Sequence, residues 1–174
     1  NNPTGLSYDD AALEELAVIC RQHQIIVVSD EIYGRVHHQN NHSSIASYYP
    51  EGTILCSGLS KWCGAGGWRL GYACVPPKLS GLMNALRTIA SETFTSVSAP
   101  IQYASISAFE PHPDIDRYLS DSVRLLEALG EWIAIQLRKA KIHIQRPEGG
   151  FYVFPDFEPL RPQLEARGIT DGPR

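Results

Sequence analysis

The stretch Ser-Gly-Leu-Ser-Lys-Trp-Cys-Gly-Ala-Gly-Gly-Trp-Arg-Leu-Gly-Tyr, residues 57–72, combines an amine, a guanidinium and several small side chains. Lys61 and Arg69 are eight positions apart (69 − 61). The intervening glycines form no Walker A loop, since Gly-Lys-Ser/Thr is missing. They form no dinucleotide-binding fingerprint either, because they precede a predicted strand and do not open a helix. The stretch therefore indicates chemistry centred on a lysine.

The segments around this stretch predict an α/β fold. A β-branched run at residues 25–29 ends in Asp30, and a second apolar run at 53–57 leads into Lys61. Runs of this kind alternate with helical patterns over about the first 110 residues, which favours a parallel sheet. Ligands bind beyond the carboxyl ends of such strands. We therefore expect Asp30 and Lys61 at one edge of the sheet, where an ordinary ion pair is the simplest alternative to a functional site.

The periodicity of apolar residues predicts the other elements. Helices are expected over residues 8–23, 78–92, 98–109 and 114–140, with a helical turn near 43–48. Buried strands are expected over residues 24–29, 53–57 and 68–75, and two further strands over 142–144 and 151–154. Ser7 is the expected cap of the first helix. The length of the last helix suggests that it connects two parts of the protein.

Composition excludes several classes of protein. The 174 residues are 43% hydrophobic and 20% charged, with a net charge of −4, as in soluble globular proteins. No apolar run approaches the ~20 residues of a membrane helix. The sequence also has no stripe of Lys and Arg, which argues against nucleic acid as the main partner. Four cysteines lack Cys-x-x-Cys spacing, which indicates reduced thiols in the cytoplasm and no metal site. His37, His38 and His42 are expected in a solvated loop.

Four short blocks occur in the order found in the class I/II aminotransferases, the fold-type I enzymes that use pyridoxal phosphate. They are Asn-Pro-Thr-Gly at 2–5, Ser-Asp-Glu-Ile-Tyr at 29–33, Ser-Lys at 60–61 with Gly-Trp-Arg-Leu-Gly at 67–71, and Pro-Glu-Gly-Gly-Phe-Tyr at 147–152. The chain thus resembles this family over nearly its whole length. The resemblance implies a three-layer α/β/α large domain with a mostly parallel sheet. Residues 1–112 would be its C-terminal portion, and 113–174 a bridging helix and the start of a smaller α+β domain.

The resemblance also implies a role for each matching residue. Asp30 would hold the proton on the pyridine nitrogen, because an electron-withdrawing ring requires that proton. Lys61 would form the Schiff base with the cofactor and later move the proton between Cα and C4′. Tyr33 and Asn2 match the positions that contact the ring hydroxyl. Arg69 matches the position that binds the cofactor phosphate.

One family position differs in this sequence. The family often has a phosphate-binding serine three residues before the lysine, and here that position is Gly58. Either Ser57 or Ser60 would then contact the phosphate, or neither would. Tyr152 and Phe154 are expected to pack in the small domain and not to bind a ligand.

The reaction implied is transamination between an α-amino acid and a 2-oxo acid, by a homodimer of the full-length parent. The alternatives are a C–S lyase or synthase of the same fold, or a non-catalytic effector-binding domain of a transcription regulator. We expect the chain to be an internal piece of a longer protein and inactive by itself. Three arginines near its end lack the context of a substrate-carboxylate ligand: Arg161, Arg167 and Arg174.

Overall fold

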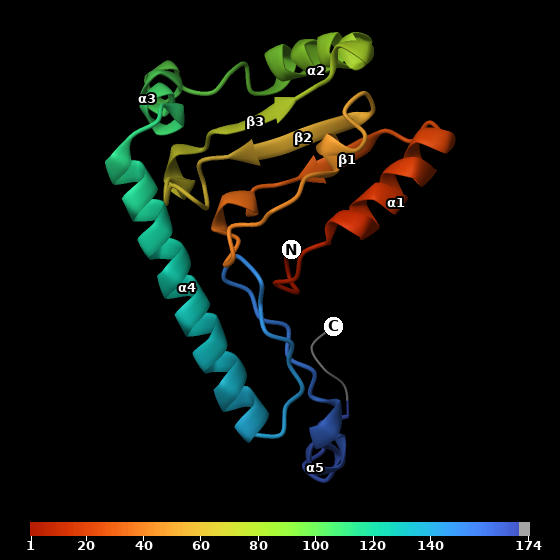
Figure 1. Cartoon of the computed structure of the whole chain (residues 1–174), viewed down its shortest axis with the longest axis vertical. Helices are drawn as coiled ribbons and strands as arrows, with labels where there is room; N and C mark the ends of the chain where they lie inside the picture. Colours follow the sequence, from red (N-terminus) through yellow and green to blue (C-terminus); the bar gives the residue numbers. More distant parts are fainter. Residues whose placement is uncertain (171–174) are drawn as a thin grey trace.

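The structure is a computed structural model, which describes residues 1–170 (Figure 1). Arg174 lies outside the described residues. The α-helices are α1 (Asp10–Gln22), α2 (Ser80–Thr93), α3 (Ala99–Phe109), α4 (Pro113–Lys139) and α5 (Arg161–Glu165). The strands are β1 (Val27–Asp30), β2 (Thr53–Gly58) and β3 (Gly71–Cys74). The expected long helices are confirmed, and the helical turn near 43–48 is a 3-10 helix at Ile45–Ser47.

The three strands form one mixed sheet in the order β1-β2-β3. The β1–β2 pair is parallel, as expected, and its register places Asp30 opposite Cys56. In contrast to the expectation of a mostly parallel sheet, β3 runs antiparallel to β2. The reason is the segment between them, which folds back on itself: the Leu59 amide donates to the Leu70 carbonyl at 3.2 Å. A parallel neighbour would need a crossover connection instead.

Helix α1 packs against the first of two apolar clusters. Its buried residues Leu13, Ala17 and Cys20 recur at helical spacing and meet Ile45 and Tyr49. The capping residue differs from the expectation. Asp9, not Ser7, caps the helix, because the Asp9 carboxylate accepts a hydrogen bond from the Ala12 amide at 2.8 Å.

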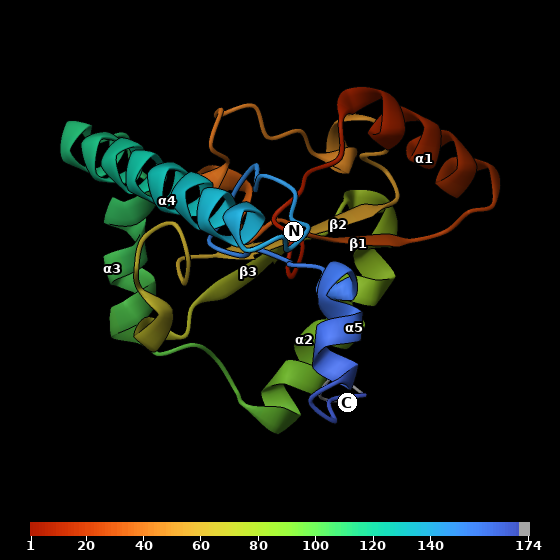
Figure 2. The same cartoon turned by 90° about the horizontal axis from the view of Figure 1, so that it is seen from below.

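The second cluster lies under the loop between β2 and β3. Its buried members are Val36, Leu59, Trp62, Ala65 and Leu70. The apolar face of α4 packs against this cluster through its N-terminal half and leaves Leu129 48% exposed further along. Helix α4 then runs from α3 to the segment that precedes α5, on the opposite side of the molecule from α1 (Figures 1 and 2).

Two expectations about strands are wrong. Val28 in β1 is 66% exposed and all of β3 is exposed, so only β2 is the buried strand that the apolar runs predicted. Residues 142–144 and 151–154 form no strands. Only single bridges lie beside them in the described residues, His143 with Asp156 and His37 with Gly149. Residues 148–150, between the two runs, bond to Gly5 and to residues 36–38. Among residues 1–170, no helix has the length and apolar character needed to cross a membrane.

Candidate active site

The carboxyl ends of β1 and β2 bring Asp30 and Ser57 together. Asp30 lies opposite Cys56 in the parallel ladder, so Ser57 is one residue further along the neighbouring strand. The Asp30 side chain is exposed and accepts a hydrogen bond from the Ile32 amide at 3.1 Å. The Ser57 hydroxyl donates to the Glu31 carbonyl at 3.4 Å. The two strands therefore end at the same edge of the sheet, whereas Lys61, the expected neighbour of Asp30, lies beyond the end of β2.

Lys61 lies in the turn that follows β2, with its amine beside two aromatic rings. Its Nζ is 5.7 Å from the centre of the Tyr33 ring and 5.5 Å from that of Phe151. The turn is anchored by its neighbours, since Leu59 is 0% and Trp62 2% exposed. In the part of the chain that the structure describes, no carboxylate pairs with Lys61. The ordinary ion pair with Asp30 is thus not formed, and the amine remains available for chemistry.

The hydroxyl of Tyr33 donates to the hydroxyl of Tyr152 at 3.1 Å. The Tyr33 ring meets the rings of Tyr152 and Phe151 edge-on, each with centres 5.6 Å apart. Burial, the bond to Tyr152 and the nearby charge of Asp30 raise the pKa of Tyr33 to about 12. Tyr33 therefore keeps its proton at neutral pH and can act as a donor.

The position of Tyr152 corrects the expectation that it only packs. Its segment is held by two distant parts of the chain: the Glu148 amide donates to the Gly5 carbonyl at 2.8 Å, and the Gly150 amide to the Val36 carbonyl at 2.9 Å. Gly5 has a φ of 73°, and a Cβ there would lie 2.6 Å from the Tyr152 carbonyl oxygen. The sequence signal for this contact was the Pro-Glu-Gly-Gly block itself.

Asn2 joins Asp30 and Tyr33 in the lining of one cavity of about 450 Å³. His37 lines the same cavity and is buried, and the neighbouring His38 ring contacts the Pro147 carbonyl at 3.1 Å. The expectation of a solvated histidine loop is therefore wrong for these two side chains. Within residues 1–170, no group of three His, Cys, Asp or Glu side chains could hold a metal ion.

Arg69 and Ser60 lie outside the cavity that Asn2, Asp30 and Tyr33 line. Arg69 follows a 3-10 helix (Gly66–Trp68), adopts a φ of 53°, and donates from Nη1 to the Gly66 carbonyl at 2.8 Å. The exposed Arg69 side chain lines a separate hollow beside Ser98. Ser60 lies partly buried in the turn before Lys61. Sequence reasoning placed these residues near the same ligand, whereas the structure assigns neither to the Asn2 cavity.

Glu31 is a residue that the sequence analysis missed. Its carboxylate accepts hydrogen bonds from Ser29 Oγ at 3.0 Å, from His42 Nε2 at 2.9 Å and from Ser44 Oγ. Burial by itself would raise the pKa of Glu31, but the bonds from His42, Ser44 and Ser29 outweigh it and hold the pKa below the ordinary value. Its place between Asp30 and Tyr33 was the only signal in the sequence.

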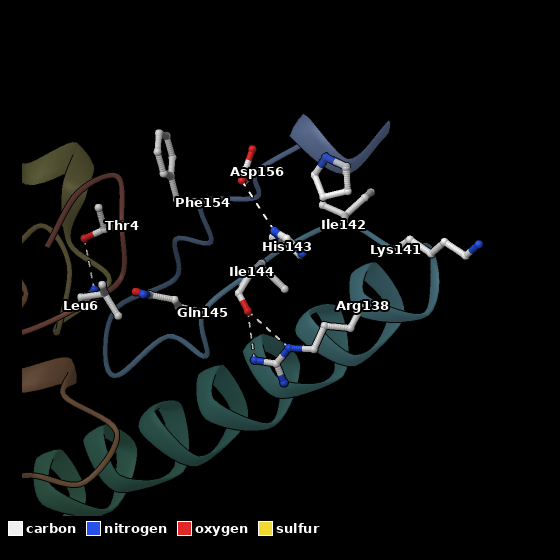
Figure 3. A pocket seen from close by; sticks show the side chains of 11 residues that line it. Thr4, Leu6, Arg138, Lys141, Ile142, His143, Ile144, Gln145, Phe154 and Asp156 are labelled. Atoms are coloured by element: carbon white, nitrogen blue, oxygen red, sulfur yellow. Dashed lines mark hydrogen bonds and ion pairs between the residues drawn. The ribbon is translucent and has the colours of Figure 1, made fainter. Parts of the chain in front are cut away.

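A further hollow lies near the C-terminal end of α4 and contains none of the predicted site residues (Figure 3). Arg138 enters it, but its guanidinium donates to the Ile144 carbonyl at 3.0 Å. The Nδ1 atom of His143 lies 3.8 Å from an oxygen of the Asp156 carboxylate, and both residues line the hollow. The first contact joins residue 144 to the end of α4, and the second joins residues 143 and 156.

Comparison with known proteins places these features in a family. The model of the family described as aminotransferase class I and II matches residues 1–169. An asparagine–oxo-acid transaminase of Streptococcus mutans is 31% identical over 98% of this chain and 42% of that protein. A probable aspartate/prephenate aminotransferase of Thermus aquaticus is 31% identical over 95% of this chain and 43% of that protein.

A solved structure gives the same result. The aspartate aminotransferase of Thermus thermophilus with maleate superimposes with a TM-score of 0.82 at 31% identity, over 93% of this chain and 42% of that one. The chain thus spans less than half the length of the relatives it matches.

Proposed function

The chain belongs to the class I and II aminotransferases, and from that premise we propose that the protein containing it is a pyridoxal-phosphate-dependent transaminase. It would move an amino group from an α-amino acid to a 2-oxo acid. The observation that carries this proposal is the Lys61 amine, which lies against Tyr33 and Phe151 without a carboxylate partner among residues 1–170. The relatives named above are aminotransferases, so a C–S lyase, a synthase or a transcription-regulator domain is not favoured.

The residues present fit the cofactor. A carboxylate, a phenol and an amide line one cavity through Asp30, Tyr33 and Asn2. The Lys61 amine does not line this cavity, and it lies 5.7 Å from the centre of the Tyr33 ring. This is the donor set that a phenolic pyridine aldehyde requires. Bound pyridoxal phosphate supplies the aldehyde that amines condense with and a protonated ring that withdraws electrons from the substrate Cα.

Lys61 would hold the cofactor through its amine. Once a substrate amine had taken its place, the freed Lys61 amine would act as the base that removes the proton from the substrate Cα and delivers it to C4′ of the cofactor, and the second half of the cycle would run this transfer in reverse. This use of one residue in two roles requires that its amine has no permanent ion pair. The structure meets that condition in the described residues.

Asp30 and Tyr33 would tune the ring from two positions. The Asp30 carboxylate accepts from the Ile32 amide through Oδ1, and its other oxygen would hold the proton on the ring nitrogen. The Tyr33 hydroxyl, whose pKa is raised to about 12, stays protonated. Its single proton, which it donates to Tyr152 in this structure, would turn to the ring oxygen, and the Tyr152 hydroxyl would then donate to Tyr33. Asn2, which lines the same cavity, would provide a second donor.

Arg69 would bind the cofactor phosphate, with a hydroxyl from Ser57 or Ser60. Its guanidinium uses one nitrogen on the Gly66 carbonyl and keeps other N–H groups for a phosphate, which a planar fork binds in a bidentate manner.

We further propose residues 1–112 as part of the cofactor-binding domain and 113–174 as the bridging helix with part of a small domain. Apolar side chains on α2 and α3 support a homodimer, since Ile89 is 60% and Tyr103 76% exposed. The cysteines in the described chain are free thiols, which supports a cytoplasmic protein. Amino and 2-oxo acids are the proposed partners, and we propose no nucleic acid or membrane partner.

The test is reconstitution with pyridoxal phosphate of the protein that contains this chain. Lys61→Ala should abolish the absorbance of the lysine-bound cofactor and lower turnover by about 10²–10⁴-fold or more. The matched control Lys139→Ala removes another lysine, at the exposed end of α4, and should change neither. Retention of both properties by Lys61→Ala would overturn the proposal.

A second measurement separates the reactions of this fold. Aspartate and asparagine are the first donors to try, because relatives are named for them. A transaminase consumes the donor only when a 2-oxo acid is present. Release of pyruvate and ammonia from a sulfur-bearing amino acid such as cysteine, without any 2-oxo acid, would instead identify a C–S lyase.

A further inference from the structure

Glu31 is the centre of a polar cluster that no catalytic role explains. Its side chain is only 10% exposed, although it carries a carboxylate. Three donors on two separate segments satisfy it: Ser29 within β1, and His42 and Ser44 from the loop that follows residue 40. A buried carboxylate is costly unless hydrogen bonds satisfy it, and the three donors around Glu31 do so.

The same cluster fits closely against the turn that carries Tyr33. The turn is closed by the Gly34 amide, which donates to the Glu31 carbonyl at 2.9 Å. The His42 ring lies on the Gly34 backbone, where a Cβ would come within 2.7 Å of the His42 Cδ2 atom. Tyr33 is thus held on both sides, by Glu31 before it and by Gly34 after it.

We propose that Glu31 is a positioning residue, which together with His42 and Ser44 clasps the 31–34 turn and sets the direction of the Tyr33 hydroxyl. The inference rests on the proposed function, because the target of that hydroxyl is the cofactor ring oxygen. Displacement of a ligand-contacting group by about 1 Å can cost about 100-fold in rate, so a clasp of this kind affects chemistry that it does not touch.

The alternative is that Glu31 only contributes stability, and a matched pair of variants separates the two. Glu51 is also a carboxylate in an ion pair, with Arg21 at 2.7 Å, but it joins α1 to the loop before β2. Glu31→Ala and Glu51→Ala each remove one such carboxylate. Glu31→Gln keeps the length and the oxygen acceptor for Ser29 and Ser44, and it should rescue most of the loss.

Three readouts are needed in the protein that contains this chain. Amide hydrogen exchange of residues 31–34, measured without cofactor, should accelerate at least about tenfold in Glu31→Ala. Affinity for pyridoxal phosphate should fall at least about tenfold, and kcat should fall more than the substrate KM rises. Glu51→Ala should leave all of these unchanged. In a Tyr33→Phe background, Glu31→Ala should cause less than about a twofold further loss of cofactor affinity.

Each result has a definite meaning. Unchanged hydrogen exchange in Glu31→Ala overturns the clasp itself. Faster exchange with unchanged cofactor affinity, or an equal loss of affinity with and without the Tyr33 hydroxyl, overturns the positioning role. If the unsubstituted protein does not bind pyridoxal phosphate, the proposed function is wrong and so is the positioning role. Hydrogen exchange is measured without cofactor, so it reports on the clasp separately from that outcome.

Discussion

Replacing Gly5 by alanine should separate the N-terminal segment from the aromatic residues of the site. Gly5 adopts a φ of 73°, and an added Cβ would lie 2.6 Å from the backbone oxygen of Tyr152 and 3.0 Å from Pro147 Cβ. The nearer atom belongs to the backbone, so a side-chain rotation cannot relieve the collision. The segment at 147–152 must therefore move away.

The magnitude follows from what is lost. A non-glycine residue in the left-handed region costs about 1 kcal/mol. Movement of the segment also breaks the bonds from the Glu148 and Gly149 amides to the Gly5 carbonyl, at 2.8 and 3.3 Å, each worth about 1 kcal/mol. We therefore expect Gly5→Ala to lower the free energy of unfolding by about 3 kcal/mol.

The assay is denaturant unfolding, with Gly168→Ala as the control. Gly168 also has a positive φ, 76°, but nothing lies within 4 Å of its added Cβ. Gly168→Ala should thus show the conformational cost alone, about 1 kcal/mol. If Gly5→Ala is no more destabilising than Gly168→Ala, the contact between the N-terminal segment and residues 147–152 does not hold the site together, and the reasoning fails.

The other predictions concern the hydroxyl pair, the clasp and the core. Tyr152→Phe should bring the pKa of Tyr33 down from about 12, because one of its causes is removed while burial remains; an NMR titration of the tyrosine Cζ carbons measures this, and an unchanged pKa would contradict the hydrogen bond. The pKa of Glu31 lies below 4.5 when folded, so Glu31 stabilises the protein above that pH and the contribution disappears as the pH falls through its folded pKa. Unfolding free energies from pH 6 to 3 should accordingly fall less steeply for Glu31→Gln, and parallel curves would refute the claim. Leu59→Ala, at a side chain 0% exposed, should cost about 2–5 kcal/mol in denaturant unfolding and weaken cofactor attachment at Lys61; a cost below about 1 kcal/mol would show that the turn is not anchored there.

Local sequence was sufficient where a structural element depends on its own residues. The long helix α4 (Pro113–Lys139) begins at a proline and has acidic residues in its first turn and basic ones in its last, all of which are readable from the sequence. The parallel β1–β2 pair likewise follows from two apolar runs separated by a helix-length connection. The ends of these strands then place Asp30 and Ser57 together without further information.

Local sequence was insufficient where the structure of a segment depends on contacts with residues far away in the chain. The direction of β3 depends on the loop that the hydrogen bond between Leu59 and Leu70 closes. The pattern of apolar residues within 71–74 gives no information about that bond. The segment at 142–154 has strand-forming residues, yet it pairs with Gly5 and Val36 and forms no strands of its own. The exposure of Val28 could not be predicted either, because the burial of a strand depends on what covers the sheet.

The sequence by itself determined the family and the α/β architecture, because these depend on residue types in a fixed order along the chain. Only the tertiary structure decided that the Tyr33 hydroxyl meets Tyr152, that the Lys61 amine lies beside the rings of Tyr33 and Phe151, and that His42 bonds to Glu31. Tyr33 and Tyr152 are 119 positions apart in the chain. A contact of that span exists only when both segments are docked on the same core, and the docking is a property of the folded whole.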